Sequence, residues 1–119
     1  VNSVFLERIY GVLDRGGVVA GSSAGAMMLG RYMSFEGWYS GTGVAGNVVI
    51  LPHHESIDPD SVAEKFSEES LKSIIGFGID SQTGVFNMPL GWTVFGEGNV
   101  IGYSQGEWVK YSDGETIPT

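Results

Sequence analysis

Gly16-Gly-Val-Val-Ala-Gly-Ser-Ser-Ala-Gly-Ala26 is the stretch that decides the fold of this 119-residue chain. Its apolar run predicts a buried strand over residues 17–20, and the residues after it predict a sharp turn followed by a helix over residues 24–31. Ser23 stands at the centre of a Gly-x-Ser-x-Gly pattern, which is typical of a nucleophile elbow, the strained strand-to-helix turn that exposes a catalytic serine. Ser23 is therefore a candidate nucleophile, and the backbone amide of Ala24 is a candidate oxyanion donor.

The composition excludes several classes of function. A net charge of −8 argues against nucleic acid as a partner, because phosphate binding needs basic patches. The sequence contains no apolar run of the ~20 residues that a membrane span needs, so we expect no membrane partner. The absence of cysteine removes thiolate catalysis and cysteine zinc sites, and it weakly favours a cytoplasmic protein. We expect no metal and no other cofactor.

Further along the chain, apolar runs alternate with helical patterns and then give way to turn-rich β segments. The predicted elements are a helix at 3–15, strands at 48–51 and 74–79, a helix from about 59 to 72, and antiparallel hairpins at 83–111. Residues 34–46 are too rich in glycine for a regular element, and Trp38 and Tyr39 within them are candidates for a pocket wall.

These elements predict an α/β fold with a mostly parallel sheet and C-terminal antiparallel hairpins. An apolar strand such as 17–20 is normally central, with neighbours on both sides. The rest of the chain supplies too few strands for this, so we expect residues 1–119 to be the C-terminal portion of a single α/β domain. An N-terminal chain or segment would complete it, and a homo-oligomer is a further expectation.

Three chemically useful residues follow three predicted apolar strands. Ser23 follows 17–20, His53 follows 48–51 and Asp80 follows 74–79. The carboxyl ends of strands form the functional edge of an open α/β sheet, so a nucleophile, a base and an acid would meet there. His54 is an alternative base. The order Ser, His, Asp differs from that of the α/β-hydrolases, in which the acid precedes the histidine.

The chain resembles the serine peptidases typified by aspartyl dipeptidase (peptidase E) and cyanophycinase over roughly residues 3–111. Residues 21–26 match their nucleophile segment Gly-x-Ser-Ala-Gly-Ala. Pro52-His53 is similar to their catalytic-histidine segment, and residues 75–80 are similar to a later Gly-x-Gly-Ile-Asp segment.

The resemblance implies a flavodoxin-like, three-layer α/β/α fold related to class I glutamine amidotransferases. It implies a serine peptidase that cleaves dipeptides or other small peptides as an exopeptidase, through a Ser23–His53–Asp80 triad and an acyl-enzyme. Some members place the acid between the serine and the histidine, which makes Glu36 an alternative acid here. The family also carries a comparable length of chain upstream, including a glycine-rich loop that helps to form the oxyanion hole.

Two other functions remain open from the sequence. One is a non-catalytic binding or assembly chain of the same fold that pairs with an N-terminal partner chain. The other is an esterase or acyltransferase that uses the same elbow. Residues 55–73 contain no arginine, so a preference for acidic peptides, which aspartyl dipeptidase recognises through an arginine, is not expected.

Overall fold

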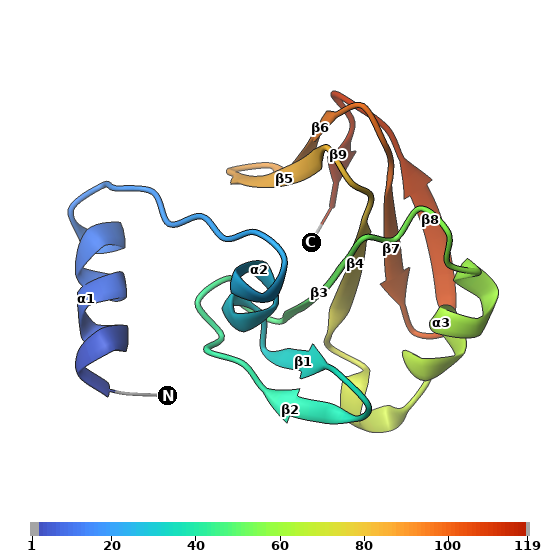
Figure 1. Cartoon of the computed structure of the whole chain (residues 1–119), viewed down its shortest axis with the longest axis horizontal. Helices are drawn as coiled ribbons and strands as arrows, with labels where there is room; N and C mark the ends of the chain where they lie inside the picture. The colour runs from blue at the N-terminus through green and yellow to red at the C-terminus, as the bar shows by residue number, and fades with distance from the viewer. Residues whose placement is uncertain (1–2, 119) are drawn as a thin grey trace.

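A computed structural model describes residues 3–118 and contains a six-stranded mixed sheet and a smaller three-stranded sheet (Figure 1). The large sheet has the order β2-β1-β3-β4-β7-β8, and the small one has the order β5-β6-β9. The helical elements are α1 (Ser3–Asp14), α2 (Ala24–Leu29), α3 (Pro59–Lys65) and the 3₁₀ helix η1 (Glu69–Leu71). The strands are β1 (Tyr32–Ser34), β2 (Trp38–Ser40), β3 (Val48–Pro52), β4 (Ile75–Ile79), β5 (Thr83–Met88), β6 (Gly91–Gly96), β7 (Val100–Ser104), β8 (Glu107–Tyr111) and β9 (Thr116–Ile117).

The predicted α/β class and the two apolar strands of the core are confirmed. β3 and β4 pair in parallel, from Val48 opposite Ile75 to Pro52 opposite Ile79, and β1 runs parallel to β3 on the other side. β7 pairs antiparallel with β4 and β8 pairs antiparallel with β7, while β5 and β6 form another of the predicted hairpins. Since parallel neighbours bring their carboxyl ends to one edge, β3 and β4 deliver the residues that follow them to the same place.

Apolar side chains are buried on both faces of the large sheet, as expected for a central strand such as β3. Val49 points into the core on the α3 side, while Val48 and Ile50 point to the side of α2 and the small sheet. The α3-side core contains Val49, Val62, Ala63, Phe66, Leu71, Ile74 and Tyr103. The opposite core contains Val48, Ile50, Phe77, Val94, Val100 and Ile117, with Ala26 of α2 packed against it.

Two glycines of β4 make room for the rings of Phe66 and His54, which pack on this strand. A Cβ on Gly76 would lie 2.4 Å from the ring of Phe66, and one on Gly78 would lie 2.2 Å from the ring of His54. No real side chain tolerates contacts this short with groups held in a packed core. The repeated glycine in Ile75-Gly-Phe-Gly-Ile79 therefore lets two rings lie directly on the strand backbone.

The predicted strand at 17–20 is wrong within residues 3–118. The segment forms no ladder with any described strand, and Val18 is 72% exposed. A strand needs a hydrogen-bonded neighbour, and the two neighbours of β3 in the large sheet are β1 and β4. Figure 1 shows α1 standing apart from both sheets, and residues 17–20 leading from it to α2.

The predicted loop at 34–46 and the long helix at 59–72 also differ from the structure. β1 and β2 form a hairpin whose turn places Glu36 and Gly37 at φ angles of 53° and 140°, a conformation that the sequence pattern did not reveal. The helix ends at Lys65, and η1 carries the chain onward to the buried Leu71. Within residues 3–118, no helix is both long and apolar enough to cross a membrane.

Candidate active site

Ser23 lies at the turn before α2 in a strained backbone conformation. Its φ is 50° and its ψ is −121°, and its carbonyl accepts the first helical hydrogen bond, from the Met27 amide at 3.0 Å. A non-glycine residue in such a conformation costs about 1–3 kcal/mol and is often found at functional sites. A Cβ on Gly21 would lie 2.7 Å from the backbone of Gly25, so only glycine permits this tight turn.

His53 leaves β3 toward the serine. Its Nε2 lies 3.3 Å from Ser23 Oγ, across 30 residues of sequence. His53 also has a positive φ, 53°, so both residues of the pair are held by unusual backbone rather than by burial. At this distance a neutral imidazole can accept the proton of the serine hydroxyl.

The other side of the His53 ring faces Ser81. His53 Nδ1 lies 3.3 Å from Ser81 Oγ, at the end of β4. Ser81 in turn donates twice to Glu55: its backbone N–H reaches Oε1 at 2.7 Å and its hydroxyl reaches Oε2 at 3.3 Å. These two hydrogen bonds, the backbone one first, lower the pKa of the Glu55 carboxyl below its ordinary value.

Asp80 does not make the contact with His53 that the sequence predicted for it. Its Oδ2 accepts a hydrogen bond from the Asn99 amide at 2.8 Å, and its own amide donates to the Asn99 carbonyl at 3.1 Å. The carboxylate therefore fixes the entry to β7. Glu36, the alternative acid, lies exposed in the β1–β2 turn, and no hydrogen bond or ion pair joins it to His53 in the part of the chain that the structure describes.

His54, the alternative base, faces away from Ser23. The alternation of side chains turns its ring into the α3-side core, where it is 5% exposed and hydrogen-bonds through Nε2 to the Tyr103 hydroxyl. Burial lowers the pKa of His54, and the negative charges of Asp80 and Glu55 oppose this only partly. Burial likewise raises the pKa of Tyr103 to about 12. His54 thus holds the core together beside the site.

The buried imidazole makes the stability of the protein depend on pH. The folded state lowers the pKa of His54 below its ordinary 6.5, so the unfolded state binds the proton more tightly. We therefore expect full stability above pH 6.5 and a loss of stability as the pH falls below it. Urea unfolding at pH 7.5 and 5.5 should show this loss, and His54→Gln should diminish it; an unchanged pH dependence in the variant would contradict the assignment.

Trp38 and Tyr39, the predicted pocket wall, lie elsewhere. Trp38 packs edge-on against Phe66 in the α3-side core, with ring centroids 5.9 Å apart, and Tyr39 is 54% exposed on β2. Neither lines the cavity beside Ser23. The hairpin, which the glycine content concealed, carries Trp38 to the α3-side face of the sheet, and Tyr39, the next residue of β2, points to the opposite face.

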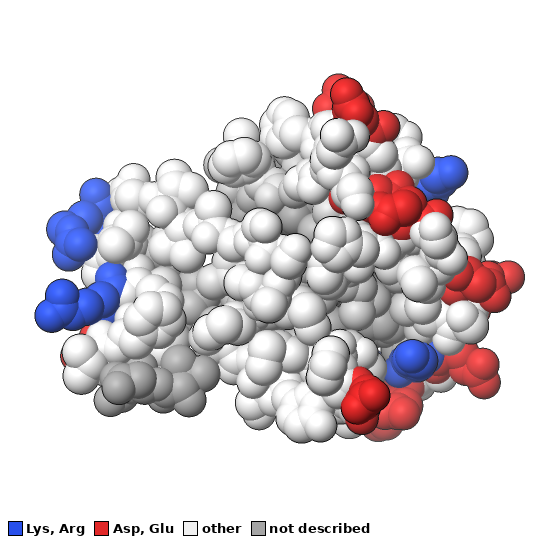
Figure 2. Space-filling view, viewed as in Figure 1, with Lys and Arg blue, Asp and Glu red and all other residues white. Residues whose placement is uncertain are grey.

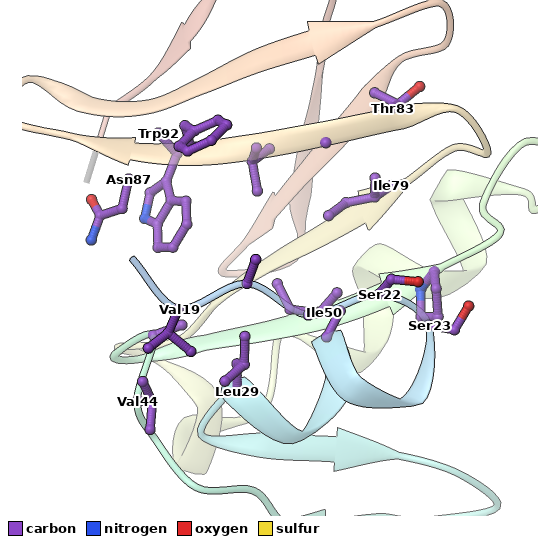
Figure 3. A pocket seen from close by; sticks show the side chains of 18 of the residues that line it. Val19, Ser22, Ser23, Leu29, Val44, Ile50, Ile79, Thr83, Asn87 and Trp92 are labelled. Carbon is purple, nitrogen blue, oxygen red and sulfur yellow. The ribbon is translucent and has the colours of Figure 1, made fainter. Parts of the chain in front are cut away.

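A cavity of about 570 Å³ opens beside the Ser23–His53 pair (Figure 3). Figure 3 shows Ser23 at one end, Leu29 and Ile50 along one wall, and Trp92 on the facing β5–β6 hairpin. Its lining is mainly apolar, and among residues 3–118 Asp80 is the acidic residue that lines it. The sequence did not predict that the β5–β6 hairpin lines the cavity, because Trp92 has the spacing of ordinary hairpin packing.

The amide of Ala24 follows Ser23 directly. Within residues 3–118, it donates to no backbone or side-chain acceptor. It is therefore free to donate to a negative oxygen that forms beside Ser23.

Most charged side chains lie away from this site, apart from Glu55 and Asp80. In Figure 2, basic side chains lie over α1, acidic side chains with basic ones among them gather on the opposite side of the molecule, and the surface between them is largely uncharged. The described residues contain no cluster of three or more His, Asp or Glu side chains arranged to hold a metal ion.

Comparison with known proteins gives one informative match. No protein-family model and no curated protein matches the chain. Among solved structures, a peptidase from an acI-B1 Actinobacterium matches with a TM-score of 0.78 and 28% sequence identity. The match covers 100% of this chain and 52% of that one, so this chain spans about half the length of the peptidase. The α/β fold around Ser23 and His53 is therefore a fold that occurs in a peptidase.

Proposed function

We propose that this chain carries the nucleophile and base of a serine peptidase. The observation that supports this most directly is the 3.3 Å separation of Ser23 Oγ and His53 Nε2, with both residues on backbone of positive φ. The likeness to a peptidase supports the same reaction class. The residue patterns favour membership of the aspartyl dipeptidase and cyanophycinase group, with its flavodoxin-like fold.

In the proposed reaction, His53 Nε2 takes the hydroxyl proton as Ser23 Oγ bonds to the carbonyl carbon of the scissile peptide. The carbonyl electron pair moves onto oxygen, and the Ala24 N–H donates to that oxyanion. When the oxyanion collapses, the C–N bond breaks and His53 returns its proton to the leaving amine. Water, deprotonated by His53, then releases the acyl group from Ser23.

The substrate we propose is a small peptide, cleaved as a dipeptidase or other exopeptidase would cleave it. The cavity of about 570 Å³ has the size of a small-molecule site rather than of an extended groove. Within residues 3–118, no lysine or arginine lines it, and Asp80 would repel a second carboxylate. We therefore propose that neutral side chains are preferred over acidic ones beside the scissile bond.

We also propose that a further polypeptide segment covers the face formed by α1 and residues 17–20. Val18 is 72% exposed, and Tyr10 and Leu13 on α1 are 43% and 38% exposed. Residues 17–20 offer backbone groups that no described strand pairs. The matched peptidase is about twice as long as this chain, so a comparable segment could pair here and contribute the second oxyanion donor. A second copy of the chain is the alternative occupant.

Covalent labelling tests the proposed nucleophile. A fluorophosphonate probe should form a phosphorus–oxygen bond with Ser23 Oγ as fluoride leaves and His53 takes the proton. Peptide mapping by mass spectrometry should place the adduct on Ser23. Labelling should vanish in Ser23→Ala and persist in Ser73→Ala, an exposed serine before β4. Equal labelling of wild type and Ser23→Ala would refute the proposal. Parallel assays with dipeptides and p-nitrophenyl esters then separate a peptidase from an esterase.

A further inference from the structure

We propose that Glu55 orients the base His53 through the hydroxyl of Ser81, so that a hydrogen-bonded pair stands where a serine peptidase ordinarily has one directly bonded carboxylate. This inference rests on the proposed function, because it assigns positioning residues to the same site. Neither residue was among the site residues predicted from the sequence.

The argument starts from the tautomer that the reaction needs. Nε2 of His53 must be unprotonated to take the proton of Ser23, so the ring proton must sit on Nδ1. An Nδ1–H requires an acceptor, and the atom 3.3 Å away is Ser81 Oγ. A hydroxyl can accept one hydrogen bond and donate another at the same time. Ser81 can therefore accept from the ring only if its own proton points elsewhere.

Glu55 determines where that proton points. Its Oε2 accepts from the Ser81 hydroxyl at 3.3 Å, which leaves the hydroxyl lone pairs free for His53 Nδ1–H. Its Oε1 accepts from the Ser81 amide at 2.7 Å, so the carboxylate is fixed by both of its oxygens to one residue. The two hydrogen bonds thus run in one direction: His53 Nδ1–H donates to Ser81 Oγ, and the Ser81 hydroxyl donates to the Glu55 carboxylate.

The charge of Glu55 also suits the imidazolium that forms when His53 takes the serine proton. Its hydrogen bonds to Ser81 keep the pKa of Glu55 low, so the group stays ionised at neutral pH. The competing carboxylate, Asp80, is held by the Asn99 amide. A carboxylate that acts through a neutral hydroxyl, in an exposed site, stabilises the imidazolium less than one in direct contact.

The kinetic test compares Ser81→Ala and Glu55→Gln with Ser81→Thr and Glu36→Gln. Loss of a directly bonded triad carboxylate costs about 10⁴-fold in kcat, so the indirect pair should cost less, about 10- to 100-fold, with KM little changed. The double variant should fall no further than either single one, because the two residues act as a unit. Ser81→Thr, which keeps a hydroxyl, should retain most activity. Glu36→Gln, which changes an exposed turn carboxylate, should match wild type.

Two readouts separate positioning from a merely structural role. The first is rescue: Ser81→Thr, which restores the hydroxyl, should keep kcat close to the wild-type value, whereas Ser81→Ala should not. Nitrogen-15 NMR of the neutral His53 imidazole should show the ring proton on Nδ1 in wild type. In Ser81→Ala and Glu55→Gln, part of the population should carry it on Nε2. This readout needs no turnover, so it tests the inference even if Ser23 proves not to be a nucleophile. An unchanged tautomer, or a changed tautomer with unchanged kcat, would overturn it.

Discussion

Replacing Ser23 with alanine should lower kcat for peptide hydrolysis by about 10⁴-fold or more. The substitution removes the atom that forms the acyl-enzyme, while the Ala24 amide and the cavity remain. The activity that persists should be the small acceleration from the oxyanion donor and binding alone. KM should change little, because Ser23 Oγ gains its bond only as the reaction proceeds.

The measurement is the steady-state rate of dipeptide cleavage by purified protein, followed by release of the new amine. Ser73→Ala, a serine without a place in the site, is the matched control and should retain the wild-type rate. The double variant Ser23→Ala/His53→Ala should be no slower than Ser23→Ala, since a base without its nucleophile has nothing to activate. A Ser23→Ala protein within twofold of wild type would end the assignment.

The second large effect is on stability. Phe66→Ala should reduce the free energy of unfolding by about 3–5 kcal/mol, because it empties the middle of the α3-side core. Phe66 is fully buried, stacks on Tyr103 with ring centroids 5.5 Å apart, and meets Trp38 edge-on. The backbone of Gly76 forms the floor of its site and cannot close over the space that the ring leaves.

Urea unfolding at pH 7.5 measures this loss as a lower midpoint at constant slope. Phe35→Ala is the matched control, because Phe35 is 69% exposed in the β1–β2 turn and its removal should change the free energy by less than about 0.5 kcal/mol. A loss of less than about 1 kcal/mol in Phe66→Ala would show that the stacked rings of Phe66 and Tyr103 are not the main source of stability in the α3-side core.

The sequence predicted that Ser23 and His53 lie together, but by a route that the structure does not use. The parallel pairing of β3 and β4, which follows from apolar runs and turn residues, places His53 beside Ser81, whereas Ser23 reaches His53 from the turn before α2 and not from the end of a strand. The sequence was not sufficient to choose the carboxylate. The direction of Asp80 depends on the Asn99 amide, 19 residues further along the chain, and no local pattern contains that contact. Two signals were present: Ser81 is adjacent to Asp80, and Glu55 follows the base by two residues.

The prediction of a buried strand at residues 17–20 failed for another reason. An apolar run predicts burial, but burial as a strand also needs a neighbour with free backbone groups, and residues 3–118 supply none there. The opposite error occurred at residues 34–46. There, glycine content suggested irregular chain, although β1 and β2 pair across a turn in which Glu36 and Gly37 take positive φ values.

The two adjacent histidines have a consequence for anyone who would move this site to another scaffold. His53 is exposed and strained, whereas the next residue, His54, is held by several contacts. The His54 ring packs on Gly78 and hydrogen-bonds to the Tyr103 hydroxyl. Its backbone N–H donates to the Ile79 carbonyl at 3.2 Å. The position of the exposed ring thus depends on its buried neighbour as well as on Ser81. A graft that copied only Ser23 and His53 would leave His53 without either support. The smallest transferable unit also includes His54, Gly78 and Tyr103, together with the Ser81–Glu55 pair.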